Sequence, residues 1–193
     1  MTPEHMADLL IAHRQQPDLQ RIVDELREQL TLEVVAVLKQ RVDKEKFSNA
    51  HTALQIAEIA QTVAASLPAS AEALPLALWT RGNALCHLCQ YQEALDCYRR
   101  AEASYARQNQ IESVAILQIN QVAVLQELGD FPTALELDRL ARQTCAMLGP
   151  EAQEYLAALD MNIGSAYQQM GDLAAALAAY ERGRASSATL GAR

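Results

Sequence analysis

The segment that decides the fold is residues 161–180, MNIGSAYQQMGDLAAALAAY, because the chain carries its pattern twice more upstream. Residues 119–138 read INQVAVLQELGDFPTALELD, and residues 79–98 read WTRGNALCHLCQYQEALDCY. The three segments align without a gap and begin 40 and 42 residues apart. Self-similarity at such a period is typical of a protein built from stacked helical units.

Each segment has the residues expected of two helices joined by a tight turn. Gly129-Asp130 and Gly171-Asp172 suit the turn, because glycine tolerates a positive φ and aspartate can cap the second helix. The first copy has Cys89-Gln90 at the same place.

Small residues recur on both helices of each segment and should let the helices approach closely. Tyr98 and Tyr180 are then expected to fill the gap against the next hairpin. The small residues are Gly82, Ala94, Ala101, Ala134, Ala141, Gly164 and Ala176. The middle copy departs from this pattern at Gln121, Val122 and Asp138, which predicts an irregular hairpin there.

The three segments resemble the tetratricopeptide repeat, in the long variant of about 40 to 42 residues whose second helix ends in a Leu-Gly step. That step occurs as Leu148-Gly149 and Leu190-Gly191. The resemblance implies an all-α fold, an α-α superhelix that is a tetratricopeptide-type solenoid of antiparallel helix hairpins. It covers residues 70–193, with three repeats at about 70–109, 110–149 and 150–191.

Residues 1–69 are expected to form an N-terminal helical capping region with a degenerate hairpin. Phe47, Ala50, Leu54 and Ala57 repeat the second-helix pattern 44 residues ahead of the first copy, which places this hairpin at about 31–67. Its first helix is expected to begin at a Thr31 cap, with Glu33 in the first turn, and its second to run past Lys46 to Leu67.

Two shorter helices are expected before this hairpin. One covers about 3–14 and opens with Thr2-Pro3, and the other covers 18–29 with Pro17 at its entry. A solenoid needs such a cap because its terminal unit otherwise exposes an apolar face.

Composition excludes several classes of function. The formal net charge is −8 and the pI is about 5.0, which argues against a nucleic-acid partner. No apolar run is long enough to span a membrane, and the first residues do not resemble a signal peptide, so we expect a cytoplasmic protein.

The four cysteines do not read as a disulfide framework. Cys86 and Cys89 have the Cys-x-x-Cys spacing of a metal or redox site, but no second pair is present and packing of small buried residues is favoured. The four histidines are scattered, and no phosphate loop or nucleophile motif occurs. We therefore expect no metal, no cofactor and no enzyme activity.

Candidate binding residues lie on the expected first helix of each hairpin. Asn120 and Asn162 match one another, and Thr80 stands at the same place in the first copy. Further polar positions follow one and two helical turns on, and these are Asn83, Ser165, Gln126 and Gln168. Such a ladder of amides suits the backbone of an extended peptide. The resemblance to long-repeat proteins such as kinesin light chains and bacterial peptide-sensing regulators implies the same role, and the alternative is that these residues only solvate the groove or cap helices.

Three apolar side chains, Trp79, Ile119 and Met161, match one another beside this ladder. Trp79 is expected to be an exposed anchor for a partner. Ile119 and Met161 are expected to pack between hairpins.

These observations predict a bacterial protein–protein interaction scaffold that binds a peptide or helix in the concave groove. One alternative is the regulatory arm of a larger enzyme or signalling protein, such as a caspase-like protease or a transcription regulator. Another is a structural protein that forms a homo-oligomer through the C-terminal hairpin, which is followed only by Ala192-Arg193.

Overall fold

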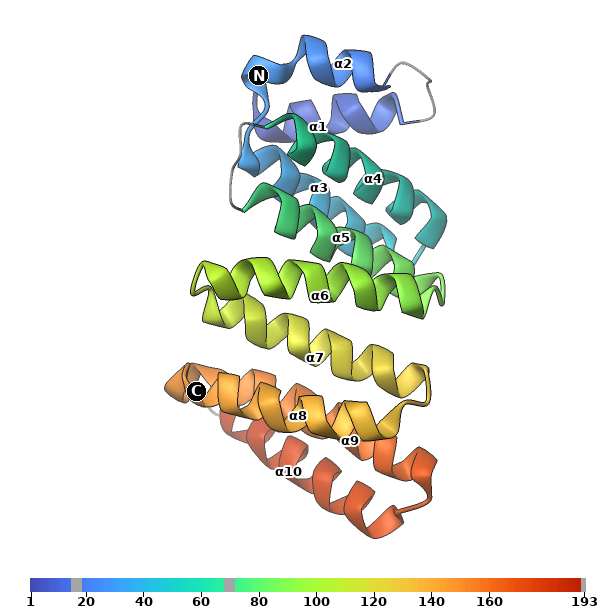
Figure 1. Ribbon diagram of the computed structural model, residues 1–193, viewed down its shortest axis with the longest axis vertical. Coiled ribbons are helices and arrows are strands. Elements are labelled where there is room, and N and C mark those ends of the chain that lie inside the picture. Colours follow the sequence, from blue (N-terminus) through green and yellow to red (C-terminus); the bar gives the residue numbers. More distant parts are fainter. Residues whose placement is uncertain (15–18, 68–71, 192–193) are drawn as a thin grey trace. The chain divides into compact units, whose positions relative to one another are not determined.

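The computed structural model describes residues 1–14, 19–67 and 72–191, all of whose regular elements are helices. The chain divides into two compact units, Met1–Ser104 and Tyr105–Arg193. The all-α fold class is therefore confirmed, and the helices form consecutive antiparallel pairs within each unit (Figure 1). No helix in the described ranges is long and apolar enough to cross a membrane.

The first unit begins with α1 (Pro3–Ala12), α2 (Leu19–Glu25) and a short 3-10 helix, η1 (Arg27–Gln29). The Thr2 hydroxyl accepts a hydrogen bond from the His5 amide, so Thr2 caps α1 as expected. The second expected helix is divided, because α2 ends at Glu25 and η1 follows. Pro17 lies outside the described residues.

The expected degenerate hairpin is present as α3 (Leu32–Glu45) and α4 (Ala50–Ser66). Thr31 stands at the N-cap position of α3, but its side chain makes no capping hydrogen bond. The expectation that the second helix includes Lys46 was wrong. The Asn49 side chain accepts a hydrogen bond from the Thr52 amide at 3.0 Å and caps α4, which therefore begins at Ala50.

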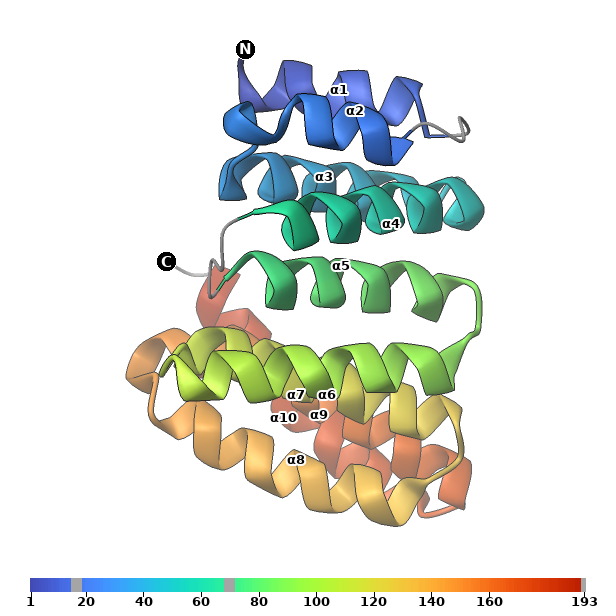
Figure 2. The ribbon, with the colours of Figure 1, turned by 45° about the horizontal axis from the view of Figure 1, so that its top comes forward.

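The remaining helices of the first unit are α5 (Ala73–His87) and α6 (Tyr91–Arg107), whose last turn contains the unit boundary. The first helices of the hairpins form one row, in which α1 packs on α3 and α3 on α5. On the other side α2 packs on α4 (Figure 2). The predicted division at residue 69/70 lies outside the described residues and stays a prediction.

The second unit holds α7 (Ile111–Glu127), α8 (Phe131–Ala146), the 3-10 helix η2 (Gly149–Ala152), α9 (Gln153–Met170) and α10 (Leu173–Gly191). Here α7 packs on both α8 and α9, and α9 packs on α10. The core of this unit includes Leu159 and Ile163 from α9 and Val122 from α7.

The turns of the three copies behave as expected. Gly129 and Gly171 have φ values of 73° and 83°, and Cys89 adopts the same left-handed conformation at 57°. Asp130 and Asp172 cap the helices that follow, since their carboxylates accept from the amides of Thr133 and Ala175. Leu148-Gly149 ends the α8 region with a positive φ at Gly149, whereas α10 continues through Gly191.

Two glycines allow the helices of a hairpin to meet. A Cβ atom added at Gly82 would lie 2.5 Å from the Tyr98 ring, and one added at Gly164 would lie 2.6 Å from the Tyr180 ring. The close approach was predicted, and each tyrosine packs on the first helix of its own hairpin.

The middle copy has a different interior. Val122 replaces the glycine and Asp138 replaces the tyrosine. Asp138 is 9% exposed and accepts from Arg142 Nε at 2.9 Å. Arg142 Nη2 also donates to Asp160 at 2.8 Å. The prediction of an irregular hairpin was wrong, because α7 and α8 are continuous helices and a charge cluster replaces the Gly–Tyr contact.

Candidate functional site

The predicted binding residues lie on the first helices of three hairpins, in two separate sets. Trp79, Thr80 and Asn83 are on α5 in the first unit. The second unit carries the others on α7 and α9, and these are Asn120, Gln126, Asn162, Ser165 and Gln168.

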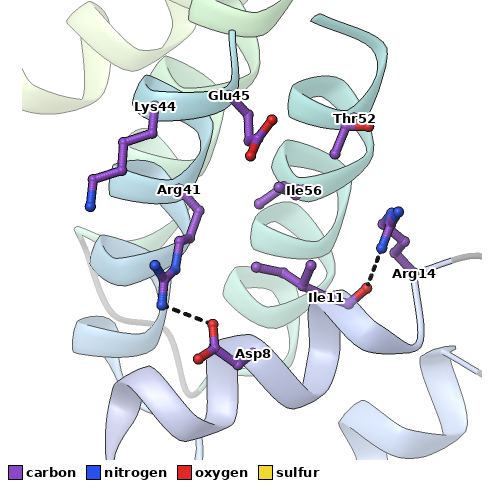
Figure 3. Close-up of a pocket in the computed structure, with 8 residues that line it drawn as sticks. All are labelled: Asp8, Ile11, Arg14, Arg41, Lys44, Glu45, Thr52 and Ile56. Atoms are coloured by element: carbon purple, nitrogen blue, oxygen red, sulfur yellow. Dashed lines mark hydrogen bonds and ion pairs between the residues drawn. The ribbon is translucent and has the colours of Figure 1, made fainter. Parts of the chain in front are cut away.

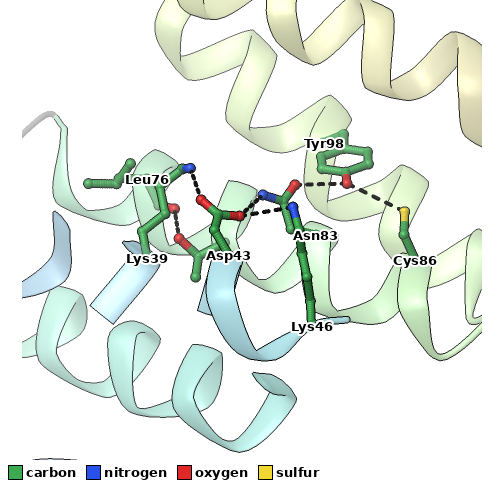
Figure 4. Close-up of polar contacts among 8 residues, drawn as sticks. Lys39, Asp43, Lys46, Leu76, Asn83, Cys86 and Tyr98 are labelled. Carbon is green, nitrogen blue, oxygen red and sulfur yellow. Dashed lines mark hydrogen bonds and ion pairs between the residues drawn. The ribbon is translucent and has the colours of Figure 1, made fainter. Parts of the chain in front are cut away.

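Asn83 is the centre of a polar network in the first unit (Figure 4). Its Nδ2 donates to Asp43 Oδ1 on α3 at 3.0 Å. Its Oδ1 accepts from the Tyr98 hydroxyl on α6 at 3.0 Å. The Tyr98 oxygen lies 3.4 Å from Cys86 Sγ, where it can accept from the thiol. The side chain of Asn83 thus links three helices.

Asp43 is the anionic member of this network. Lys39 Nζ lies 2.6 Å from Asp43 Oδ2, and Lys46 Nζ lies 3.1 Å from Oδ1. Burial alone would raise the pKa of Asp43, but the hydrogen bonds and charges of the two lysines outweigh it and hold the pKa below its ordinary value. Burial also raises the pKa of Tyr98. At neutral pH Asp43 is therefore a carboxylate and Tyr98 a neutral phenol.

Thr80 and Trp79 are less accessible than a groove residue should be. Thr80 is 0% exposed, and its hydroxyl donates to the Leu76 carbonyl oxygen at 2.7 Å. The side chain of Thr80 is therefore inaccessible to a binding partner in this structure. Trp79 is partly buried, and Lys39 Nζ lies 4.8 Å from the centre of its ring.

The strongly exposed aromatic side chain of this region is Phe47, at 77%. It lies between α3 and α4 and meets the His87 ring edge-on, with the ring centres 4.8 Å apart. Sequence reasoning missed it because the repeat pattern placed Phe47 inside a helix. The signal that could have revealed it is Ser48-Asn49, since an asparagine N-cap leaves the preceding residues outside the helix.

In the second unit, most of the predicted ladder is occupied by contacts within the protein. Gln126 is buried and its Nε2 donates to the Ser165 hydroxyl at 2.7 Å. Asn162 Nδ2 donates to the Ile119 carbonyl oxygen at 3.4 Å. Gln168 is exposed and accepts from the Tyr180 hydroxyl at 2.9 Å.

Asn120 differs from these residues. It is partly exposed on α7, and its side chain makes no hydrogen bond to any described residue. Of the matched apolar pair, Ile119 is 8% exposed, as expected for packing between helices. Met161 is 51% exposed, so the expectation that it packs between hairpins was wrong.

The cysteines are all free thiols. Cys97 and Cys145 are buried, Cys86 is half-buried and Cys89 is exposed. Burial raises the pKa of Cys86, Cys97 and Cys145, which keeps these thiols protonated. The described part of the chain contains no group of three or more His, Cys, Asp or Glu side chains placed to hold a metal ion.

Residues 75–110 match the family model of the tetratricopeptide repeat. This segment comprises most of α5, all of α6 and the connection that follows it, residues 108–110. Residues 75–110 therefore form a tetratricopeptide repeat. Its membership of the long-repeat variant stays a prediction. No curated protein and no solved structure matches the chain.

The family assignment bears on function at a general level. Tetratricopeptide repeats support a role in protein–protein interaction, and they are interaction modules more typically than enzymes.

Proposed function

We propose that this protein binds an extended peptide segment of another protein along the first helices of its hairpins. The observation that carries the proposal is the free amide of Asn120, which stands at a repeated position on α7 and is partly exposed. A carboxamide offers both a donor and an acceptor, which is what a peptide bond requires.

The neighbouring side chains support a peptide ligand. On α9, which packs against α7, Met161 is exposed and flexible enough to cover an apolar side chain of the ligand. Asn162 donates a long hydrogen bond of 3.4 Å to the Ile119 carbonyl oxygen. This weak bond can be replaced by a hydrogen bond to the ligand with little loss of free energy. Gln126, Ser165 and Gln168 have shorter bonds and are expected to position the face more than to contact the ligand.

In the first unit, Trp79 is expected to contact the ligand and Asn83 to position the face. Asn83 is held by Asp43 and Tyr98, and Trp79 by the contact with Lys39. Both are therefore rigid, which lowers the entropy lost when a ligand binds. Thr80 is buried and is therefore not expected to contact the ligand.

We expect Asn120→Ala to weaken peptide binding by about tenfold, which is the effect of one lost pair of amide hydrogen bonds. A peptide selected from a displayed random library on the full chain serves as the probe. Its affinity for each variant is measured by fluorescence anisotropy, and helicity is checked by circular dichroism.

Gln143→Ala is the matched control, because Gln143 is an exposed amide on the second helix α8. It should bind the peptide as the wild type does. Equal affinity of the Asn120→Ala, Asn162→Ala and Gln143→Ala variants would show that the α7–α9 face is not the binding surface.

A second candidate function is self-association through α10. Phe131 and Leu135 on α8 are partly buried against the core that includes α9. The residues at the same repeat positions on α10 are Leu173 and Leu177, which are 68% and 59% exposed. Exposed Ala174 and Ala178 alternate with them, so two copies of this face can interdigitate large and small residues about a two-fold axis.

Leu177→Glu should weaken this self-association at least tenfold, roughly the effect of placing a charge in an apolar contact. Sedimentation equilibrium measures the dimer dissociation constant. Leu140→Glu is the control, because Leu140 is an exposed leucine on α8, at 45%. A wild-type chain that stays monomeric at high concentration would refute this candidate.

A further inference from the structure

A pocket of about 350 Å³ lies in the first unit between α1, α3 and α4 (Figure 3). This volume falls in the range of small-molecule sites. Ile56, which is 2% exposed, and Ile11 give it an apolar wall. The other lining residues are polar or charged, and these are Asp8, Arg14, Arg41, Lys44, Glu45 and Thr52.

Contacts within the protein hold two of the cationic side chains in place. Arg14 Nε donates to Gln55 Oε1 at 3.3 Å, and its Nη1 donates to the Ile11 carbonyl oxygen at 3.2 Å. Arg41 Nη2 lies 2.9 Å from Asp8 Oδ1 on α1. The two guanidinium groups are thus positioned before any ligand arrives, which favours binding.

Unused hydrogen-bonding groups in this pocket are mainly donors. Arg41 Nε is buried and has no acceptor among the described residues. The Lys44 ammonium has no hydrogen-bond or ion-pair partner in the described ranges. Both acidic side chains have partners, since Asp8 pairs with Arg41 and Glu45 accepts from the Ser48 hydroxyl at 3.1 Å. Three cationic side chains face two carboxylates in this pocket, and the excess positive charge with its free donors favours an anion.

We propose that this pocket binds a small amphiphilic acid, in which a carboxylate or phosphate is attached to a short apolar body. The anionic group takes the free donors of Arg14, Arg41 and Lys44, and the apolar body lies on Ile11 and Ile56. Arg41 keeps its ion pair with Asp8 through Nη2 and offers its free Nε to the ligand. Thr52 lies in the first turn of α4, where the helix dipole favours negative charge.

The test uses three probes that share a phenyl body: 4-phenylbutyrate, phenyl phosphate and neutral 4-phenylbutanamide. Each is titrated into the ¹⁵N-labelled full chain and followed by NMR. At least one acid should shift the amide signals around Ile11, Thr52 and Ile56. The neutral amide should bind at least tenfold more weakly, roughly the effect of losing a charge-assisted hydrogen bond. The preferred acid then identifies the anionic group as carboxylate or phosphate.

Lys44→Glu and Arg139→Glu form a matched pair of variants. Both residues are exposed and each variant reverses one positive charge, but Arg139 lies on α8 in the second unit. Lys44→Glu should weaken binding of the acid by about tenfold or more, and Arg139→Glu by less than about twofold. Equal effects of the two variants, equal binding of the neutral probe, or no binding of either acid would overturn the proposal.

Discussion

Replacing Arg142 by methionine is expected to lower the free energy of unfolding of the second unit by about 2 to 3 kcal/mol. Arg142 lies between two buried carboxylates and donates to both, at 2.9 Å to Asp138 and 2.8 Å to Asp160. Asp138 Oδ1 is already buried without a hydrogen-bond partner among the described residues. Without Arg142, the carboxylate of Asp138 would be left buried and uncompensated.

Asp160 should be affected less than Asp138, because Arg182 Nε also donates to it at 3.1 Å. The proposed measurement is urea denaturation followed by circular dichroism. The matched control is Arg100→Met, since Arg100 forms an exposed pair with Asp96 at 3.3 Å, with side chains 58% and 66% exposed. That pair should contribute only a few tenths, roughly, of a kcal/mol. Equal stability of the two variants would mean that the buried charges are solvated in some other way.

The charge cluster around Arg142 illustrates what the sequence revealed and what it did not. Val122 and Asp138 depart from the repeat pattern, and this departure was taken to predict an irregular hairpin. The spacing of Asp138 and Arg142, four residues apart on one helix, is the signal that could have predicted their ion pair. The contact between Arg142 and Asp160 joins α8 to α9, and no local sequence pattern predicts such a contact.

The hairpins were predictable because their signals are local. Glycine at a turn, aspartate after it and small residues at helical spacing each act within a few residues. The degenerate hairpin of α3 and α4 was found in the same way, with an error at Lys46 because the Asn49 cap was overlooked.

The exposure of the predicted binding residues was harder to predict, because it depends on neighbouring helices. Thr80 and Asn120 occupy equivalent positions in the alignment, yet Thr80 is in the core and Asn120 is partly exposed. Asn83 was predicted as a binding residue, and in the structure its side chain donates to Asp43, which lies 40 residues away in the sequence. The sequence contains no sign that these two side chains meet.

The contact between Gly82 and Tyr98 should be intolerant of any larger residue at position 82. Even one Cβ atom would lie 2.5 Å from the ring. The ring cannot move aside easily, because Tyr98 is 3% exposed and its hydroxyl is held by Asn83 at 3.0 Å. We expect Gly82→Val to lower the free energy of unfolding of the first unit by about 3 kcal/mol. Thermal and urea denaturation of the wild type and the variant measure this difference in the free energy of unfolding.

A double-mutant cycle distinguishes two causes of this loss of stability, overlap with the Tyr98 ring and a backbone requirement for glycine. Val122 occupies the equivalent place in the middle copy, where Asp138 replaces the tyrosine, so valine itself is compatible with a hairpin of this kind. If overlap with the ring is responsible, Gly82→Val combined with Tyr98→Ala should be more stable than the sum of the single effects predicts, by about 1 to 2 kcal/mol. Strict additivity would show that the glycine is needed for the backbone of α5 and not for the tyrosine.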